Sequence, residues 1–150
     1  MVPASHSDID QSRLARFLGF RLTRAKVQVH RALTSRLASH ELSTTDFSAL
    51  VLIDANPGLY QRQLGLALEI SPPNVVPIID RLVQREVVVR LPSKDDRRMQ
   101  ELHLTDAGRA LLKNAEADVA RFEQLLEESL TATEQRYIDS ALKKLSAFEA

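Results

Sequence analysis

Apolar residues recur at every third or fourth position through the first part of the chain, the spacing of one face of a helix. This run extends from Gln11 to about Ser39, without proline and with a single glycine. Its apolar positions are Leu14, Leu18, Leu22, Ala25, Val29, Leu33 and Leu37. The pattern predicts one long helix that follows a loose tail over residues 1–10.

Capping residues mark the starts of the next helices. The stretch Ser43-Thr44-Thr45-Asp46 is a capping box with Asp in place of the usual Glu, and it predicts a helix that ends at Asn56-Pro57-Gly58. A short helix fits residues 61–68. Ser71 is the predicted N-cap of a fourth helix, which begins with the unusual sequence SPPNVVPIIDRL.

After residue 85 the pattern changes to short β-type runs. Residues 87–90 are mostly β-branched and residues 100–104 alternate polar and apolar, so they predict two strands of a hairpin joined by a charged loop over residues 92–98. Thr105 and the capping box at 131–134 then open two further helices. This order predicts a mainly α fold with a small β-hairpin, in a single domain over residues 1–150.

The fourth helix carries prolines that its amphipathic pattern places outside the core. At 100° per residue, its apolar side consists of Val75, Val76, Ile79, Leu82 and Val83. Its other side consists of Pro73, Pro77, Asp80, Arg81 and Gln84, with Asn74 at the edge. First-turn prolines cost little, but an interior proline such as Pro77 removes a backbone hydrogen bond and costs about 3 kcal/mol. Either a kinked, hydrated surface helix or a function of this face explains its presence.

The composition is that of a folded protein, with 44% apolar and 27% charged residues among 150. The absence of cysteine excludes disulfides and thiolate metal sites. The N-terminal sequence lacks the basic and apolar segments of a signal peptide, and no apolar run approaches the roughly 20 residues of a membrane span. We therefore expect a cytoplasmic protein without a membrane partner.

Charge is segregated along the chain although the formal net charge is zero. Residues 12–40 contain seven basic side chains and no acid, whereas acids outnumber bases from Thr105 onward. A net charge of zero argues against non-specific binding of nucleic acid through overall charge. The segregation of charge along the chain instead favours a defined binding surface.

The predicted hairpin carries a specific motif. Asp96-Arg97-Arg98 is followed by Leu102-His103-Leu104-Thr105 and by Gly108, which matches the pattern D-x-R…L-x-L-T…G. Through this motif and the order of its elements, nearly the whole chain resembles the MarR family of transcriptional regulators. The resemblance implies a winged helix-turn-helix lobe over residues 42–105, with dimerisation helices over residues 11–40 and 106–150.

The resemblance also implies a homodimer whose two lobes bind a pseudo-palindromic operator in double-stranded DNA. By pattern, the dimer contact consists of Leu14, Leu18, Phe122, Leu126, Ile138, Leu142 and Leu145. Small-molecule effectors of the family commonly bind between the lobe and the dimerisation helices. Because two recognition helices must enter grooves about 34 Å apart, a ligand that changes the lobe separation would release the DNA.

In the family pattern, the arginine that matches Arg98 enters the minor groove and the aspartate that matches Asp96 holds it. Lys94 and Arg97 are expected phosphate partners, as are Gln61 and Arg62 at the start of the third helix. A solvated charged turn without a DNA contact is the alternative for this loop.

The fourth helix would then lie in the major groove. The rings of Pro73 and Pro77 are expected to touch thymine methyl groups, and Asn74 an adenine edge. Ser71 and the helix N-terminus would meet phosphate. Many family members carry a polar or basic residue near position 77, so this departure moves the expected hydrogen-bond reading to Asn74 and Arg81.

Asp80 is expected to pair with a neighbouring arginine, because phosphate would repel it.

The first helix offers candidate ligand residues in a second, sparser stripe that also holds several arginines. In one interpretation its aromatic residues pack against the partner subunit and its arginines pair with acids of the last two helices. In the other, Phe17 and Phe20 receive an apolar body while Arg21 or Arg24 receives a carboxylate or phosphate. An anionic aromatic compound or an acyl thioester fits the second interpretation.

No enzyme is predicted. His6, His30, His40 and His103 are too scattered for a metal site, and the sequence contains no catalytic constellation or cofactor motif. The prediction is a ligand-responsive transcriptional regulator, and the resemblance favours a repressor because repressors are commoner than activators in the family. The alternative is a winged-helix module that binds protein instead of DNA. A small hydrolase has no candidate nucleophile and base.

Overall fold

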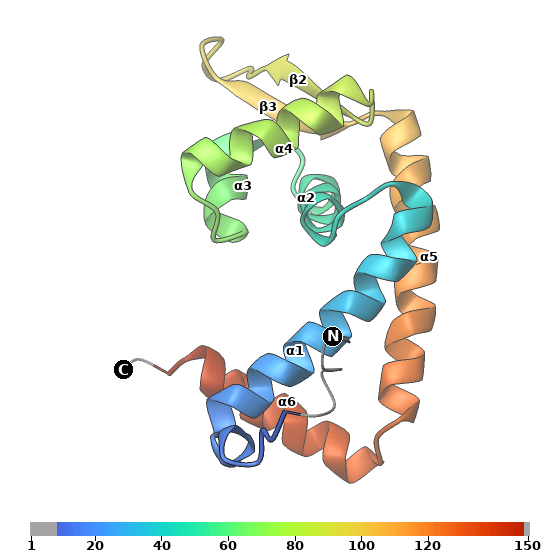
Figure 1. The fold of residues 1–150 in the computed structure, drawn as a ribbon. Helices are drawn as coiled ribbons and strands as arrows, with labels where there is room; N and C mark the ends of the chain where they lie inside the picture. Colours follow the sequence, from blue (N-terminus) through green and yellow to red (C-terminus); the bar gives the residue numbers. More distant parts are fainter. Residues whose placement is uncertain (1–8, 149–150) are drawn as a thin grey trace, which may run out of the picture.

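The computed structural model describes residues 9–148, so most of the predicted tail, with His6, lies outside the described residues. Figure 1 shows a lobe of short helices and a small sheet, connected by the long helix α5 to the helix α6 at the opposite end of the molecule. The lobe contains α2 (Thr44–Ala55), β1 (Leu59–Tyr60), α3 (Gln61–Ala67), α4 (Pro72–Gln84), β2 (Val88–Pro92) and β3 (Gln100–Leu104). The remaining elements are η2 (Leu14–Arg16), α1 (Leu18–Leu37), η3 (Ala38–His40), α5 (Asp106–Glu128) and α6 (Ala132–Ser146).

The predicted first helix is interrupted. Phe17 is extended, with φ −86° and ψ 126°, and separates the 3₁₀ turn η2 from α1. Phe17 at the break is 65% exposed. The spacing of apolar residues shows which face of a helix is apolar. It continues unchanged through residue 17 and therefore does not predict the break in the helix.

The three capped helices begin where the sequence predicts. Ser43 and Asp46 form the capping box of α2, the Thr105 side chain accepts from the Gly108 amide at the start of α5, and Thr131 with Glu134 forms the capping box of α6. Gly108 has a further role, because a Cβ there would lie 2.0 Å from the Val87 carbonyl oxygen. This close approach fixes the start of α5 against the lobe.

The core of the lobe lies between α2, α3, α4 and the sheet. Its fully buried large side chains include Leu50, Ile53, Leu64, Ile79, Leu82 and Leu102. Val75 is also buried, but the prediction for Val76 is wrong, since Val76 is 40% exposed and Ile78 packs against the core instead. Val76 lies one helical step from Val75, toward the side that carries Pro73 and Pro77.

The predicted hairpin forms, and a third strand joins it. β2 and β3 pair antiparallel, with Val88 opposite Leu104 and Pro92 opposite Gln100. β1 pairs with the other edge of β3, which gives the order β1-β3-β2. The sequence did not predict β1, because two residues are too few to show a period.

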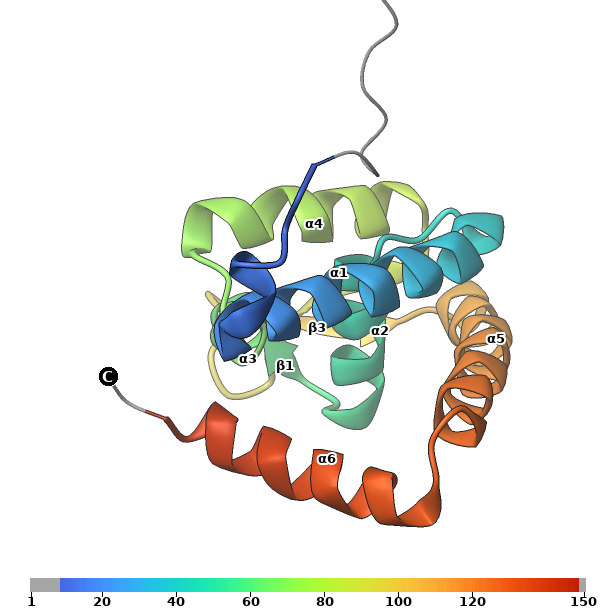
Figure 2. The same ribbon diagram turned by 60° about the horizontal axis from the view of Figure 1, so that its bottom comes forward.

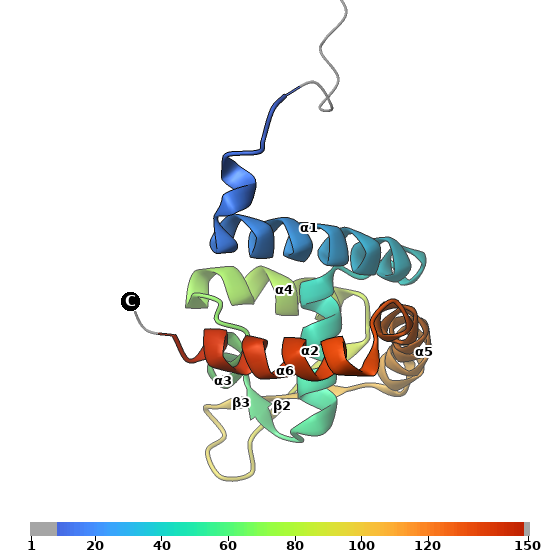
Figure 3. The same cartoon turned by 90° about the horizontal axis from the view of Figure 1, so that it is seen from below.

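The helices outside the lobe leave much apolar surface uncovered. Figure 2 shows α6 along the bottom of the view, α1 across its middle and α5 at the right. In Figure 3, α1 and α6 lie with nearly parallel axes and opposite chain directions, and α5 is seen nearly end-on. No residue of α6 is buried, and its apolar side chains Tyr137, Ile138, Leu142 and Leu145 are all exposed.

Candidate functional site

The outer face of α4 is exposed and mostly uncharged. Pro73, Asn74 and Pro77 are all exposed, as the helical wheel predicts, and the helix continues through Pro77. Ser71 occupies the N-cap position, but its side chain makes no capping hydrogen bond. The N-terminal half of α4 therefore presents one amide side chain between two proline rings.

Asp80 pairs with an arginine, as expected. The Arg90 guanidinium on β2 donates to the Asp80 carboxylate at 2.6 Å and to the Gln61 side-chain oxygen at 3.4 Å. This cluster joins the sheet, the recognition-type helix α4 and the start of α3. Gln61 thus lies within the lobe's own polar network, whereas its neighbour Arg62 is exposed.

Arg81, the second charged residue of α4, donates from its guanidinium to the carboxylate of Asp46 on α2. The side chain of Asp46 is 3% exposed and that of Arg81 is 48% exposed. Burial would raise the pKa of Asp46, but hydrogen bonds from Arg81 and Ser43 outweigh it and hold the pKa below its ordinary value. The sequence did not reveal this pair, because its members are 35 residues apart.

The loop between β2 and β3 presents a braced arginine. The Arg98 guanidinium donates through Nε and Nη2 to the two Asp96 carboxylate oxygens, both at 3.1 Å, while 90% of the Arg98 side chain is exposed. These bonds, with a third from the Arg98 backbone, hold the pKa of Asp96 below its ordinary value. The predicted phosphate partners Lys94 and Arg97 are exposed on the same loop.

The base of this loop is fixed from inside. Ser93 is 1% exposed, and its hydroxyl bonds to the Tyr60 hydroxyl at 3.0 Å and accepts from the Asp95 amide at 3.2 Å. The wing, which is the hairpin of β2 and β3 with its loop, therefore has a hydrogen-bonded base that holds its tip in place.

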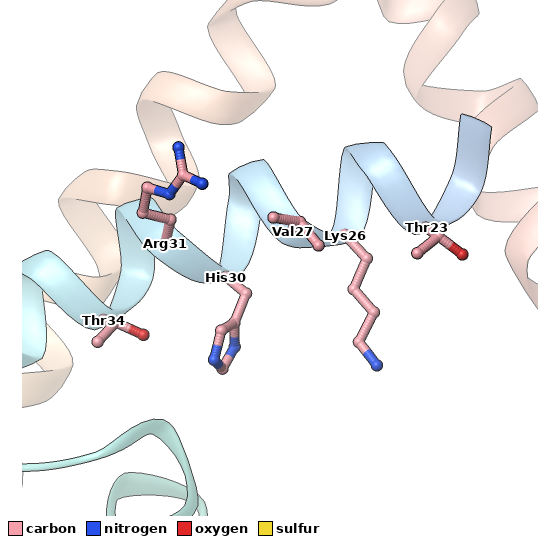
Figure 4. Close-up of a pocket in the computed structure, with 6 residues that line it drawn as sticks. All are labelled: Thr23, Lys26, Val27, His30, Arg31 and Thr34. Carbon is pink, nitrogen blue, oxygen red and sulfur yellow. The ribbon is translucent and has the colours of Figure 1, made fainter. Parts of the chain in front are cut away.

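A groove of about 650 Å³ runs along α1, shown in Figure 4. Its lining residues are Thr23, Lys26, Val27, His30, Arg31 and Thr34. The lining contains basic and hydroxyl side chains and no acid. The side chains of Lys26 and His30 point in the same direction from the helix (Figure 4).

None of the four residues predicted for ligand binding lines this groove. Phe17 and Arg21 are exposed near the start of α1. The Arg24 guanidinium lies 5.9 Å from the Phe20 ring centroid and donates to the Gln11 side chain at 2.8 Å. All six lining residues lie on α1, so the basic stripe of the first helix was visible in the sequence, but the sequence prediction placed the ligand nearer the start of that helix.

The described part of the chain has neither a candidate metal site nor a membrane-spanning helix. Residues 9–148 contain no group of three or more His, Cys, Asp or Glu side chains placed to hold a metal ion. No helix among them is long and apolar enough to cross a membrane.

Comparison with known proteins places this geometry in a family. The family model described as the MarR family matches residues 42–99, most of the lobe. A structure of the transcriptional repressor CouR bound to a 23-mer DNA duplex is 36% identical, with a TM-score of 0.86, and the match covers 93% of this chain and 99% of that one. The chain belongs to the MarR family.

Two further MarR-type structures carry ligands. CouR bound to p-coumaroyl-CoA is 35% identical to this chain, with a TM-score of 0.84 and coverage of 93% and 98% of the two chains. The transcriptional repressor Rv2887 of Mycobacterium tuberculosis, in complex with p-aminosalicylic acid, is 28% identical, with a TM-score of 0.68 and coverage of 87% and 98%. This MarR-family chain is a DNA-binding transcriptional regulator with a winged helix-turn-helix lobe.

Proposed function

We propose that this protein is a homodimeric repressor that binds a pseudo-palindromic operator and leaves it when an anionic ligand occupies the α1 groove. The observation that carries the DNA-binding part is Arg98, which extends from a rigid wing and is braced by Asp96 while 90% of its side chain stays exposed. A minor groove concentrates negative potential, so an exposed, oriented guanidinium is suited to enter it.

The remaining DNA contacts follow from the position of the lobe. With the wing in the minor groove, α4 enters the neighbouring major groove, where Asn74 meets a base edge and the rings of Pro73 and Pro77 meet thymine methyl groups. Ser71 lies at the helix N-terminus, which favours phosphate. Arg62, Lys94 and Arg97 are exposed and serve as phosphate partners.

The α1 groove supports a ligand with both an apolar and an anionic part. Lys26, His30 and Arg31 supply cationic or hydrogen-bonding groups, and Val27 supplies apolar surface. CouR binds p-coumaroyl-CoA, which combines an aromatic acyl group with phosphates, and Rv2887 binds an aromatic acid. We therefore infer that the effector is an aromatic acid or its acyl thioester. The proposed function involves no catalysis and is exercised in the cytoplasm.

The deciding experiment is a gel-shift titration of the protein against the DNA upstream of its own gene, at two salt concentrations. Arg98→Ala should weaken binding across different sequences by about tenfold or more and reduce the salt-dependence slope by about two, because each subunit of the dimer loses one phosphate-region contact. Arg121→Ala is the matched control, since Arg121 is an exposed arginine on α5 outside the lobe.

A protein-binding winged-helix module would behave differently. Its wild type would not shift any DNA of the operator region, and Arg98→Ala would change nothing. If wild type and Arg98→Ala bound DNA with equal affinity and equal salt dependence, the assignment of the wing would be wrong.

A further inference from the structure

The recognition helix α4 contains two charged residues among its 13, Asp80 and Arg81. Both are engaged inside the lobe. Asp80 accepts from Arg90 at 2.6 Å, and Arg81 donates to Asp46. An arginine in the middle of a helix in the major groove would ordinarily be the first candidate to read guanine. Here its guanidinium has an internal partner.

The partner of Arg81 is held from two sides. One carboxylate oxygen of Asp46 accepts from the Ser43 amide at 3.0 Å and from the Ser43 hydroxyl at 2.7 Å. The other oxygen accepts from Arg81. Ser43 and Asp46 together cap α2, so the carboxylate is fixed to the start of that helix.

Release of Arg81 would be costly. Asp46 is 2% exposed, and a buried carboxylate that loses its cationic partner keeps the cost of desolvation without the compensating attraction. The partly exposed Arg81 could be hydrated on its own, but Asp46 could not. The asymmetry keeps the guanidinium directed toward α2.

We propose that Asp46 is a positioning residue of the DNA-reading surface, which fixes α4 against α2 and withholds Arg81 from the bases. This inference rests on the proposed function, in which α4 enters the major groove. Base reading is then confined to the N-terminal half of α4, where Asn74 lies between Pro73 and Pro77. The operator consequently has no guanine requirement at the position that Arg81 would face.

The first test is a double-mutant cycle in thermal unfolding, which needs no DNA. Asp46→Asn and Arg81→Ala should each lower the melting temperature by about 5 °C, and the double variant should be no worse than Asp46→Asn alone, because both changes remove one interaction. Arg81→Gln, which keeps a donor, should fall between Arg81→Ala and wild type. Additive shifts would overturn the pairing.

The second test is selection of binding sites from randomised DNA by wild type, Arg81→Ala and Asn74→Ala. Arg81→Ala should select the same sequence as wild type, with unchanged base preference at every position. Its overall affinity for that sequence should fall by about tenfold or less. Asn74→Ala is the comparison and should lose preference at one position of each half-site. A specific loss of guanine preference in Arg81→Ala would refute the inference. A wild type that selects no sequence would refute the proposed DNA reading instead, while the unfolding cycle would still decide whether Asp46 fixes the helix.

Discussion

Arg98 and Arg81 each pair with an aspartate, but only the aspartate of Arg98 leaves the guanidinium free to turn toward DNA. The partner of Arg98 is Asp96, two residues away on the same loop and 42% exposed, so the pair can turn toward DNA as a unit. The partner of Arg81 is Asp46, a buried residue in the first turn of α2, so the Arg81 guanidinium is directed toward that helix. Arg98 and Arg81 therefore differ in the exposure of their acids as well as in their own exposure.

Gly108 gives a prediction at the residue scale. A Cβ at this position would lie 2.0 Å from the Val87 carbonyl oxygen, so Gly108→Ala must displace either α5 or the end of the lobe. We expect a loss of about 2–4 kcal/mol in the free energy of unfolding, measured by chemical denaturation. The control is Ala107→Gly at the exposed neighbouring position, which should cost less than about 1 kcal/mol. Equal losses in the two variants would show that the close approach does not matter.

At the scale of elements, the sequence predicted best where a local signal exists. The capping residues Ser43, Thr105 and Thr131 each start a helix where expected, because a cap acts within three residues. The break at Phe17 and the strand β1 escaped, because a break leaves the apolar period unchanged and β1 gains its identity only by pairing with β3.

The candidate site divides in the same way. The brace between Asp96 and Arg98 was expected because a family motif records it within three residues. The pair of Arg81 with Asp46 depends on packing between elements 35 residues apart, which a single chain without structure does not reveal. The α1 groove lies within one helix, and the sequence prediction missed it because it placed the ligand at Phe17, Phe20, Arg21 and Arg24.

The interior proline of α4 provides a prediction for an element. Pro77→Ala restores a backbone donor and should stabilise the protein by about 2 kcal/mol in thermal or chemical unfolding. If the ring of Pro77 touches a thymine methyl group, the same variant should bind operator DNA more weakly. The control is Pro72→Ala in the first turn, where proline costs little, so its stability should change far less. A stabilised Pro77→Ala variant with unchanged DNA affinity would favour the plain surface-helix explanation.

At the scale of the whole molecule, the groove on α1 lies a few residues along the chain from a junction with the end of α4. The groove ends near Thr34, and the chain then turns through η3 to His40 and Glu41. The Arg85 guanidinium, just beyond α4, donates to the carbonyl oxygens of these two residues at 3.1 and 2.7 Å. A ligand that shifts α1 would therefore act on the orientation of α4 through Arg85.

His40 also connects this junction to α5. Its ring nitrogen lies 2.7 Å from the Asp118 carboxylate, so the end of α1, the end of α4 and the middle of α5 meet at one corner. Motion of the lobe relative to the long helices would change the contacts at this corner. In a dimer, such motion changes the distance between the two recognition helices, which sets whether both can enter successive major grooves.

Transmission through lobe separation requires a dimer, and in the proposed function the uncovered apolar face of α6 supplies the dimer contact. Leu142 is 53% exposed there, next to Ile138 and Leu145. Leu142→Arg should give a monomer in sedimentation velocity with an unchanged circular dichroism spectrum, because no residue of α6 is buried within the chain. Its operator affinity should fall by about 100-fold or more, since the two half-sites are then bound independently. Lys143→Ala, one residue away and ion-paired to Asp139 on the same helix, should remain a dimer with wild-type affinity. A Leu142→Arg variant that stays dimeric at the same concentration would place the dimer contact elsewhere, and the transmission of ligand binding through lobe separation would need a different geometry.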